Sequence, residues 1–294
     1  MRKNPFAKRY RPAWVAAAFV LVLTLTFTVP PLRAVAENFL ALFRVQTIEF
    51  VEFNPLNLPD DQTLESAAVE IERLLNEEAV FEQKGETQTV DAATARSLVA
   101  FPVRLPGALE DDVHQIDVQP GVHIAMQVDL ARIRTLLEGL GYQNIALPDS
   151  LEGADVGVDI EPSVTASYGA CSSQARDDCT LFIQMRSPNV TAPPELDVEQ
   201  LGQLYLRMLG MTAREAARFS KNIDWTTTLV VPIPSDQTKY EDVAVDGVMG
   251  TFIQARNQKQ SPEYALMWLK DDVVYALIGS GNKSSALDIA ASLK

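Results

Sequence analysis

Histidine and cysteine are scarce in this chain of 294 residues, which contains two of each. The two cysteines, Cys171 and Cys179, lack the C-x2-C spacing of common zinc sites and have no histidine nearby. The sequence also lacks a G-x-S-x-G nucleophile motif and a G-x-x-x-x-G-K phosphate loop. No set of residues stands out as catalytic, and we expect neither an enzyme nor a bound cofactor or metal. Acidic residues are plentiful, so composition leaves a paired-carboxylate hydrolase open.

The two histidines, His114 and His123, lie on either side of Pro120-Gly121, a turn signal between two largely apolar or alternating runs at 113–118 and 123–128. The pattern predicts a hairpin that brings the histidines together near Asp111, Asp112 and Asp117. A metal site with two histidines and a carboxylate is one interpretation. Surface or edge-strand histidines are the other, and we favour it.

Basic residues are few beyond the amino end. The chain has 25 Lys and Arg against 39 Asp and Glu, for a net charge of −14. Residues 1–12 hold five of the basic residues and no acid, which leaves 20 basic against 39 acidic residues, or −19. Phosphates would repel so acidic a domain, which argues against a nucleic-acid partner. The charge suits a soluble domain, and a basic partner remains open.

One segment at the amino end carries no charge, from residue 12 to residue 32. About 20 apolar residues span a bilayer core, and the basic residues before the segment place that side in the cytoplasm. We therefore predict a cytoplasmic tail (1–12), a single transmembrane segment (13–32), a juxtamembrane segment (33–60) and an extracytoplasmic domain (61–294), anchored at the cytoplasmic membrane. The alternative is secretion after cleavage following Ala36, because residues 34–36 have the small-x-small form of a signal-peptidase site.

Cys171 and Cys179 lie in a Gly-, Ser- and Asp-rich stretch that is typical of an exposed loop. Outside the cytoplasm, such a pair usually forms a disulfide, and we predict one here. The closed loop is short, so its entropic contribution to stability is limited.

The pattern of the domain predicts an α+β fold. Apolar residues repeat at helical spacing over 64–75, with Asp61 as a candidate cap, and two more helices are expected at 198–209 and 212–219. Thr212 and Glu215 have the spacing of a capping box. Prolines at 188, 193 and 194 suggest a linker and a division into two subdomains near 188–197.

Near the carboxyl end, the pattern predicts a strand at 229–233 and then a four-stranded antiparallel meander (240–245, 248–255, 263–270 and 273–279). A helix at 284–293, with Ser284 as its cap, closes the meander. A two-residue turn at Asp271-Asp272 would place Trp268 opposite Tyr275 and Leu266 opposite Leu277. Both faces of this hairpin are apolar, so each must be covered. Either a helix such as 198–219 covers the second face, making these residues core, or the face is a groove for a lipid or peptide.

Two groups of residues carry a resemblance to a known family: residues 39–46, and residues 245–250, 267–268, 274–279 and 289–293. The first group resembles the juxtamembrane segment of certain bacterial zinc-finger anti-sigma factors. The second group resembles an uncharacterised extracytoplasmic domain that some of them carry. The resemblance implies a bacterial cytoplasmic membrane and a relation to envelope signalling. The cytoplasmic zinc domain of such proteins is not matched, since residues 1–11 hold neither His nor Cys.

Two function classes follow. The first is a membrane-anchored extracytoplasmic sensor or interaction domain without catalysis, whose partner is an envelope protein. The second is a carrier-like protein that binds a small apolar ligand on its sheet. A closed core with a partner surface would favour the first, and an open apolar cavity the second.

Overall fold

The structure is a computed structural model that describes residues 45–54, 73, 79–139, 141, 147, 149–171, 179–193, 196–235, 238–256 and 263–294. The predicted cytoplasmic tail and transmembrane segment lie outside these residues, as do most of the helix predicted over 64–75 and its candidate cap Asp61. In the part that is described, no helix is long and apolar enough to cross a membrane.

The domain is α+β, as predicted, and its sheets are mostly antiparallel. The strands are β1 (Thr47–Phe53), β2 (Ala79–Gln83), β3 (Gln88–Thr89), β4 (Val113–Gln119), β5 (Val122–Gln127), β6 (Asp155–Ile160), β7 (Ser163–Gly169), β8 (Cys179–Arg186), β9 (Asn189–Thr191), β10 (Thr228–Pro234), β11 (Thr238–Val245), β12 (Val248–Ala255), β13 (Glu263–Lys270) and β14 (Val273–Ser280). The helices are α4 (Ala92–Leu98), α5 (Leu130–Gly139), α6 (Val198–Met208), α7 (Ala213–Ser220) and α8 (Lys283–Ala291), with short 3-10 turns η4 (Gly107–Asp112) and η5 (Asp149–Leu151).

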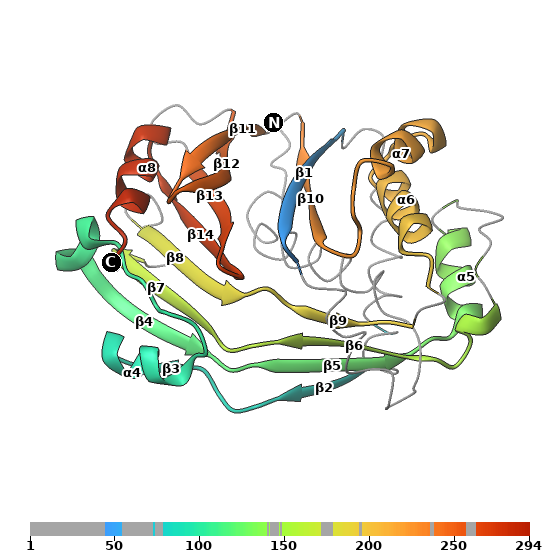
Figure 1. Ribbon diagram of the computed structural model, residues 1–294, viewed down its shortest axis with the longest axis horizontal. Coiled ribbons are helices and arrows are strands. Elements are labelled where there is room, and N and C mark those ends of the chain that lie inside the picture. Colours follow the sequence, from blue (N-terminus) through green and yellow to red (C-terminus); the bar gives the residue numbers. More distant parts are fainter. Residues whose placement is uncertain are drawn as a thin grey trace, which may run out of the picture.

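Three long strands cross the width of the molecule, each interrupted once near its middle (Figure 1). They are β4 followed by β5, β6 followed by β7, and β8 followed by β9. β4, β7 and β8 belong to an eight-stranded sheet, in the order β11-β12-β13-β14-β8-β7-β4-β3. β5, β6 and β9 belong to a four-stranded sheet, in the order β2-β5-β6-β9. The two sheets are thus joined by strands that run from one into the other.

The hairpin predicted at Pro120-Gly121 is therefore wrong. Gln119 pairs with Ser163, and Val122 pairs with Ile160. Two residues separate these pairs on each strand (120–121 and 161–162), so the same register continues through the interruption. A two-residue hairpin turn needs positive φ, which proline cannot adopt and Gly121 does not adopt here. Pro120, Pro162 and Pro188 lack an N–H, so they interrupt the ladder while the chain continues in the same direction.

The C-terminal meander has the predicted register. Trp268 pairs with Tyr275, and Leu266 with Leu277. Asp271 and Asp272 both have positive φ (51° and 63°), as do Asp246 and Gly247 in the preceding hairpin. This backbone matches the turn type that two-residue hairpins favour.

One face of the eight-stranded sheet, here called the core face, packs beneath α4 and α8. Ala95 of α4 and Ala286 and Ala290 of α8 are buried against it. The terminal helix was predicted, but its cap is Asn282 rather than Ser284: the Asn282 side chain accepts from the Ser285 N–H. Ser284 lies within the first turn, where its own N–H needs a cap.

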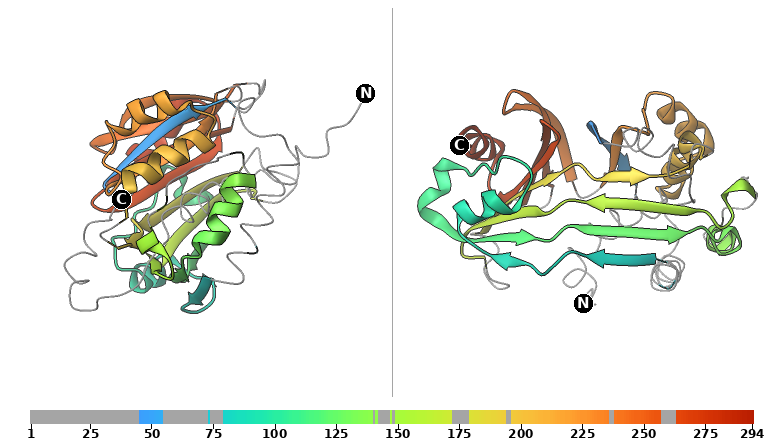
Figure 2. Two further views of the ribbon diagram at one scale, coloured as in Figure 1. Left: turned by 90° about the vertical axis from the view of Figure 1, so that its right-hand side faces the viewer. Right: turned by 60° about the horizontal axis from the view of Figure 1, so that its bottom comes forward.

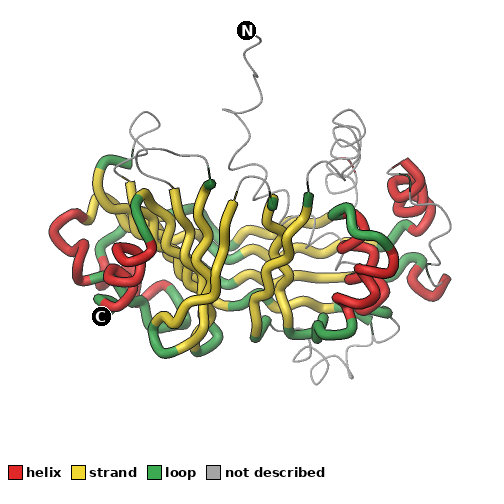
Figure 3. The backbone as a smooth tube through the Cα atoms, turned by 90° about the horizontal axis from the view of Figure 1, so that it is seen from above, coloured by secondary structure: helices red, strands yellow, loops and turns green. Residues whose placement is uncertain are grey.

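The opposite face, here called the second face, meets a parallel strand pair. Strands β1 and β10 pair in parallel although about 180 residues separate them. β1 contacts β13. Tyr240 lies on the second face of β11, where burial raises its pKa and the negative charges of Glu52 and Glu49 on β1 raise it further. The helices predicted at 198–219 cover the outer side of this pair rather than the meander itself, through Val51, Tyr205 and Leu206. Figure 3 shows β1 and β10 between the other strands and these helices.

Other local predictions can be checked. The capping box of Thr212 and Glu215 is present at the start of α7. The segment predicted as a linker contains a strand, β9, because Asn189–Thr191 pair with β6. Strand β7 was not anticipated: its sequence, SVTASYG, is rich in small residues and gives a weak strand pattern.

Candidate interaction surface

The four residues proposed as contact or core belong to the core. Trp268 and Tyr275 are 1% and 4% exposed, and Leu266 and Leu277 are fully buried. The rings of Trp268 and Tyr275 stack at 5.2 Å between centroids, and Phe182 of β8 stacks on both. Aromatic pairs at this spacing stabilise a core beyond the area they bury. These side chains cannot reach a partner while the domain is folded.

The second face of the meander is closed at its centre. Thr251 and Val274 are buried there. Exposed apolar residues on this face, such as Met249 and Ile278, lie on different cross-strand rows, and the row of Thr251, Met267 and Ala276 lies between them. Across the described residues, this face is a packed layer rather than an open apolar cavity.

The histidines do not come together. His114 lies on β4 and His123 on β5, nine residues further along one continued strand, or roughly 30 Å at strand spacing. His123 instead pairs with Asp159 on β6, with Nδ1 2.8 Å from Oδ1. Within the described part of the chain, no three His, Cys, Asp or Glu side chains are placed to hold a metal ion.

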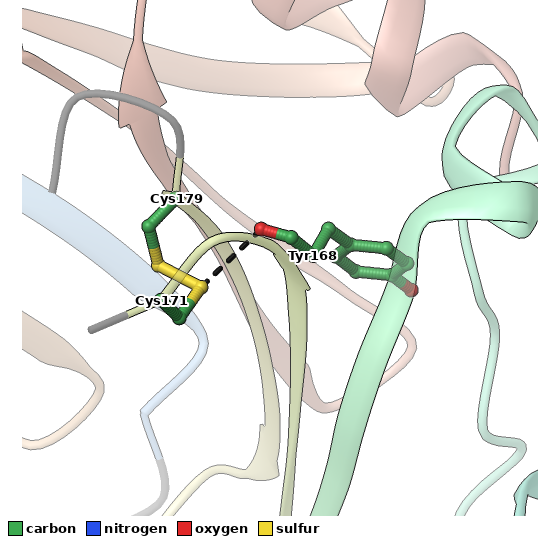
Figure 4. The surroundings of a disulfide bond; sticks show 3 residues. All are labelled: Tyr168, Cys171 and Cys179. Atoms are coloured by element: carbon green, nitrogen blue, oxygen red, sulfur yellow. Dashed lines mark hydrogen bonds between the residues drawn. A yellow bond between two sulfur atoms is a disulfide. The ribbon is translucent and has the colours of Figure 1, made fainter. Parts of the chain in front are cut away.

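The predicted disulfide joins Cys171 and Cys179 at the end of the β7–β8 hairpin, just beyond the Gly169–Cys179 pair (Figure 4). Cys171 Sγ lies 3.2 Å from the Tyr168 carbonyl oxygen. A disulfide sulfur carries no proton, so this is a close contact and not a donated hydrogen bond. The disulfide is structural and agrees with an extracytoplasmic domain.

A cavity of about 430 Å³ lies between the end of β1 and the α6–α7 turn. Phe53, Met211 and Phe219 contribute apolar surface, and Glu215 and Arg218 are polar. Glu215 is already used, because its carboxylate accepts from the Thr212 N–H and hydroxyl to cap α7. That use lowers the pKa of Glu215, through the Thr212 hydrogen bonds. Glu52, Arg218 and Asn222 also line the cavity.

An exposed apolar edge is the remaining feature, and it lies on β2. Val80 and Phe81 are 57% and 53% exposed on opposite faces of this strand. Within the described part of the chain, β2 pairs on one side only, with β5. The right-hand view of Figure 2 shows β2 at the outer side of β5, at the edge of the sheet.

The β11 edge of the eight-stranded sheet is protected differently. There β11 presents Lys239, Glu241 and Asp242 to solvent. Charged side chains, bulges and prolines are the usual means of preventing strand addition at an edge. Strand β2 carries one acid, Glu82, between its apolar residues and its end. Its two adjacent apolar side chains, Val80 and Phe81, are both more than half exposed, whereas on β11 the exposed Tyr240 lies among charged residues.

The sequence pointed to this surface only weakly. The stretch 81–88 is largely polar, a pattern that fits either a strand or a loop. The indication of this surface lies at the start of the strand, in Ala79-Val80-Phe81, where adjacent apolar residues must face opposite sides of a strand. Whether both sides are exposed depends on position in the sheet, which the local pattern does not encode.

Comparison with known proteins places no further restriction on this surface. No protein-family model matches the chain, and no characterised protein or solved structure is significantly similar to it.

Proposed function

We propose that this protein is a membrane-anchored extracytoplasmic sensor or interaction domain that binds a partner protein of the cell envelope and performs no catalysis. The observation that carries the proposal is the apolar edge strand β2, with Val80 and Phe81 more than half exposed. Soluble domains rarely leave such an edge uncovered unless a partner pairs with it.

Three further features support the proposal. The core face is closed by stacked aromatics, which leaves no apolar cavity for a carried ligand among the described residues of the meander. The disulfide fits an oxidising compartment. The resemblance of both chain ends to the outer part of anti-sigma factors agrees with a role in envelope signalling.

Site-specific photo-crosslinking in cells tests the proposal. A photoreactive benzoyl-phenylalanine in place of Phe81 should yield a discrete adduct in the membrane fraction. The matched control places the same group at Met249, an exposed apolar residue on the other sheet. That position should give no adduct of the same mass.

Two results would contradict the proposal. One is the absence of any adduct from position 81 in cells that contain the folded chain. The other is turnover of a substrate in a broad hydrolase screen that is abolished by His123→Ala or Asp159→Asn.

A further inference from the structure

We propose that β2 accepts an extended segment of the partner as an additional antiparallel strand, and that this segment carries a basic residue opposite Glu82 followed by two apolar residues. The inference rests on the proposed function and specifies the chemistry of the partner. It follows from the backbone, the charges and the apolar side chains along this one edge.

The backbone of β2 offers hydrogen-bonding groups at alternate residues. The Lys84 N–H donates to the Gly121 carbonyl at 3.0 Å, which makes Lys84 and Gly121 a hydrogen-bonded pair in the register of β2 and β5. In an antiparallel ladder such pairs alternate. Val80 and Glu82 therefore direct their backbone groups toward β5. Ala79, Phe81 and Gln83 direct theirs outward, where an added strand can pair with them.

The register fixes which side chains approach most closely. An antiparallel segment that pairs with the outward groups of Phe81 places its neighbours opposite Glu82 and Val80 as non-hydrogen-bonded pairs. Cα atoms in such pairs are about 4.5 Å apart, closer than in hydrogen-bonded pairs. The residue opposite Glu82 therefore contributes most to electrostatic selectivity.

The charge on this face is negative. Glu82 lies beside His123, His123 beside Asp159, and Asp159 beside Asn189, in one cross-strand row. The His123 ring is hydrogen bonded to Asp159, while Glu82 is exposed at the end of the row. A lysine or arginine on the added strand would continue this row with opposite charge, and an acid would be repelled.

The apolar positions extend surfaces that already exist. Phe81 ends a cross-strand row with Ile124, Val158 and Val190, in which Val158 is fully buried. An apolar residue opposite Phe81 would cover the exposed ring. Val80 lies on the same face as Glu82, beside Ala125 and Gly157, and leaves room for a β-branched partner.

A second copy of this chain fits the edge poorly. Two-fold antiparallel pairing about Phe81 would set Val80 of one copy opposite Glu82 of the other, and it would bring together two chains that each carry a net charge of −14. The like charges of the two copies oppose association, and Glu82 opposite Val80 would have no opposite charge to pair with. The observations favour a different, locally basic partner.

Peptide titration of the full chain in detergent micelles, followed by amide NMR, tests the inference. The probe is Ser-Thr-Lys-Val-Val-Thr-Ser with blocked ends, and its control replaces Lys with Glu. We expect the lysine peptide to shift the amide signals of Phe81 and Gln83 most, since those N–H groups point outward. The glutamate peptide should bind about three- to fivefold more weakly.

Three variants separate backbone pairing from side-chain contact. Phe81→Pro removes an outward N–H and spares the ladder with β5, so binding should be lost while the domain stays folded. Phe81→Thr keeps that N–H and should bind with intermediate strength. Glu82→Lys should reverse the preference between the two peptides.

The outcomes are distinct. Equal binding of both peptides, or binding that survives Phe81→Pro, overturns the inference. So does a dimer by sedimentation that Phe81→Pro dissolves, because the edge would then belong to a second copy. If neither peptide binds but the crosslink from position 81 still forms, only the inferred sequence of the partner segment is overturned. If the crosslink does not form, the proposed function itself is refuted.

Discussion

At the scale of single residues, a buried glutamine ties the segment after α4 to the core sheet. Gln184 is fully buried; its Oε1 accepts from the Arg104 N–H at 2.9 Å and its Nε2 donates to the Arg104 carbonyl at 2.8 Å. The amide thus takes the place of a neighbouring strand for one residue. Its apolar surroundings make both hydrogen bonds difficult to replace.

We expect Gln184→Met to lower the free energy of unfolding by about 2–3 kcal/mol, because two buried backbone groups of Arg104 lose their partner. Urea denaturation would measure the change. Gln119→Met is the control: Gln119 is exposed on β4, so its substitution should stay within about 0.5 kcal/mol. Equal effects of the two substitutions would contradict this role for Gln184.

A charged cluster fixes the β11–β12 turn. The Asp246 carboxylate, 10% exposed, accepts from both terminal nitrogens of Arg104 and from Lys270 Nζ at 3.0 Å. Burial acts to raise the pKa of Asp246, but the hydrogen bonds and charges of Arg104 and Lys270 outweigh it and lower that pKa below its usual value. Asp246 also tolerates the positive φ of the turn.

Asp246→Asn should therefore cost about 1–2 kcal/mol at pH 7, since asparagine keeps the backbone conformation and loses only the charge. A carboxyl with a lowered folded-state pKa stabilises the fold above its unfolded pKa and loses this contribution as pH falls through the folded pKa. The difference between wild type and variant should shrink below about pH 4.

Urea midpoints between pH 3 and 7 would measure this trend. Asp271→Asn provides a matched control, because Asp271 occupies the other two-residue turn with the same φ of 51° and is exposed. A pH-independent difference for Asp246→Asn would show that the charge is not what stabilises the turn.

At the scale of elements, one glycine decides how α6 packs. A Cβ on Gly202 would lie 2.2–2.4 Å from ring atoms of Trp225, so the indole rests directly on the helix backbone. Trp225 is held there by a hydrogen bond of 2.8 Å from Nε1 to the buried Ser220 hydroxyl. The glycine is required by this close approach.

Gly202→Ala should destabilise the domain by roughly 1–3 kcal/mol, because the clash with Trp225 exceeds the gain in helix propensity. Gly139→Ala is the matched control at the end of α5, where nothing lies within 4 Å of the added Cβ. It should be neutral or stabilise by up to about 1 kcal/mol. Thermal unfolding that gave both variants the same sign would refute this account.

The disulfide is an element-scale constraint on the β7–β8 hairpin. Its removal by Cys171→Ser with Cys179→Ser should cost at most roughly 2.5 kcal/mol, because the loop it closes is short. The paired strands keep the hairpin ends together without it. Thiol labelling of unreduced protein from its native compartment should find neither sulfur reactive, and two labelled thiols would exclude the bond there.

At the scale of the whole molecule, the amino end and the domain meet through β1. Ser187 at the interruption of the third long strand donates from its hydroxyl to the Val45 carbonyl at 2.8 Å, just before β1 begins. The start of β1, which pairs with β10, is thus tied to the interruption of the third long strand.

Retention of residues 13–32 as an anchor remains a prediction from the charge pattern. Intact-mass measurement of the membrane fraction should find the full-length chain, because the apolar stretch is longer than the roughly 7–15 residues usual in a signal peptide. A soluble mature protein that begins at Glu37 would contradict it and support secretion.

Features that depend on neighbouring residues could be predicted from the sequence alone. The meander turns at Asp246-Gly247 and Asp271-Asp272, the pairing of Trp268 with Tyr275, the capping box at Thr212 and the disulfide all follow from spacings of a few residues. Such features are encoded locally because turn conformation and cap geometry depend on the residue types at those positions.

Only the tertiary structure decided what depends on distant segments. Pro120-Gly121 has the composition of a turn, yet the adjacent strands β6 and β7 keep the chain straight by pairing on both sides of it. The parallel pairing of β1 with β10 joins segments about 180 residues apart in the sequence, and the exposure of Phe81 follows from β2 being an edge. A local pattern records that a residue is apolar, but which neighbours cover it is settled when the sheets assemble.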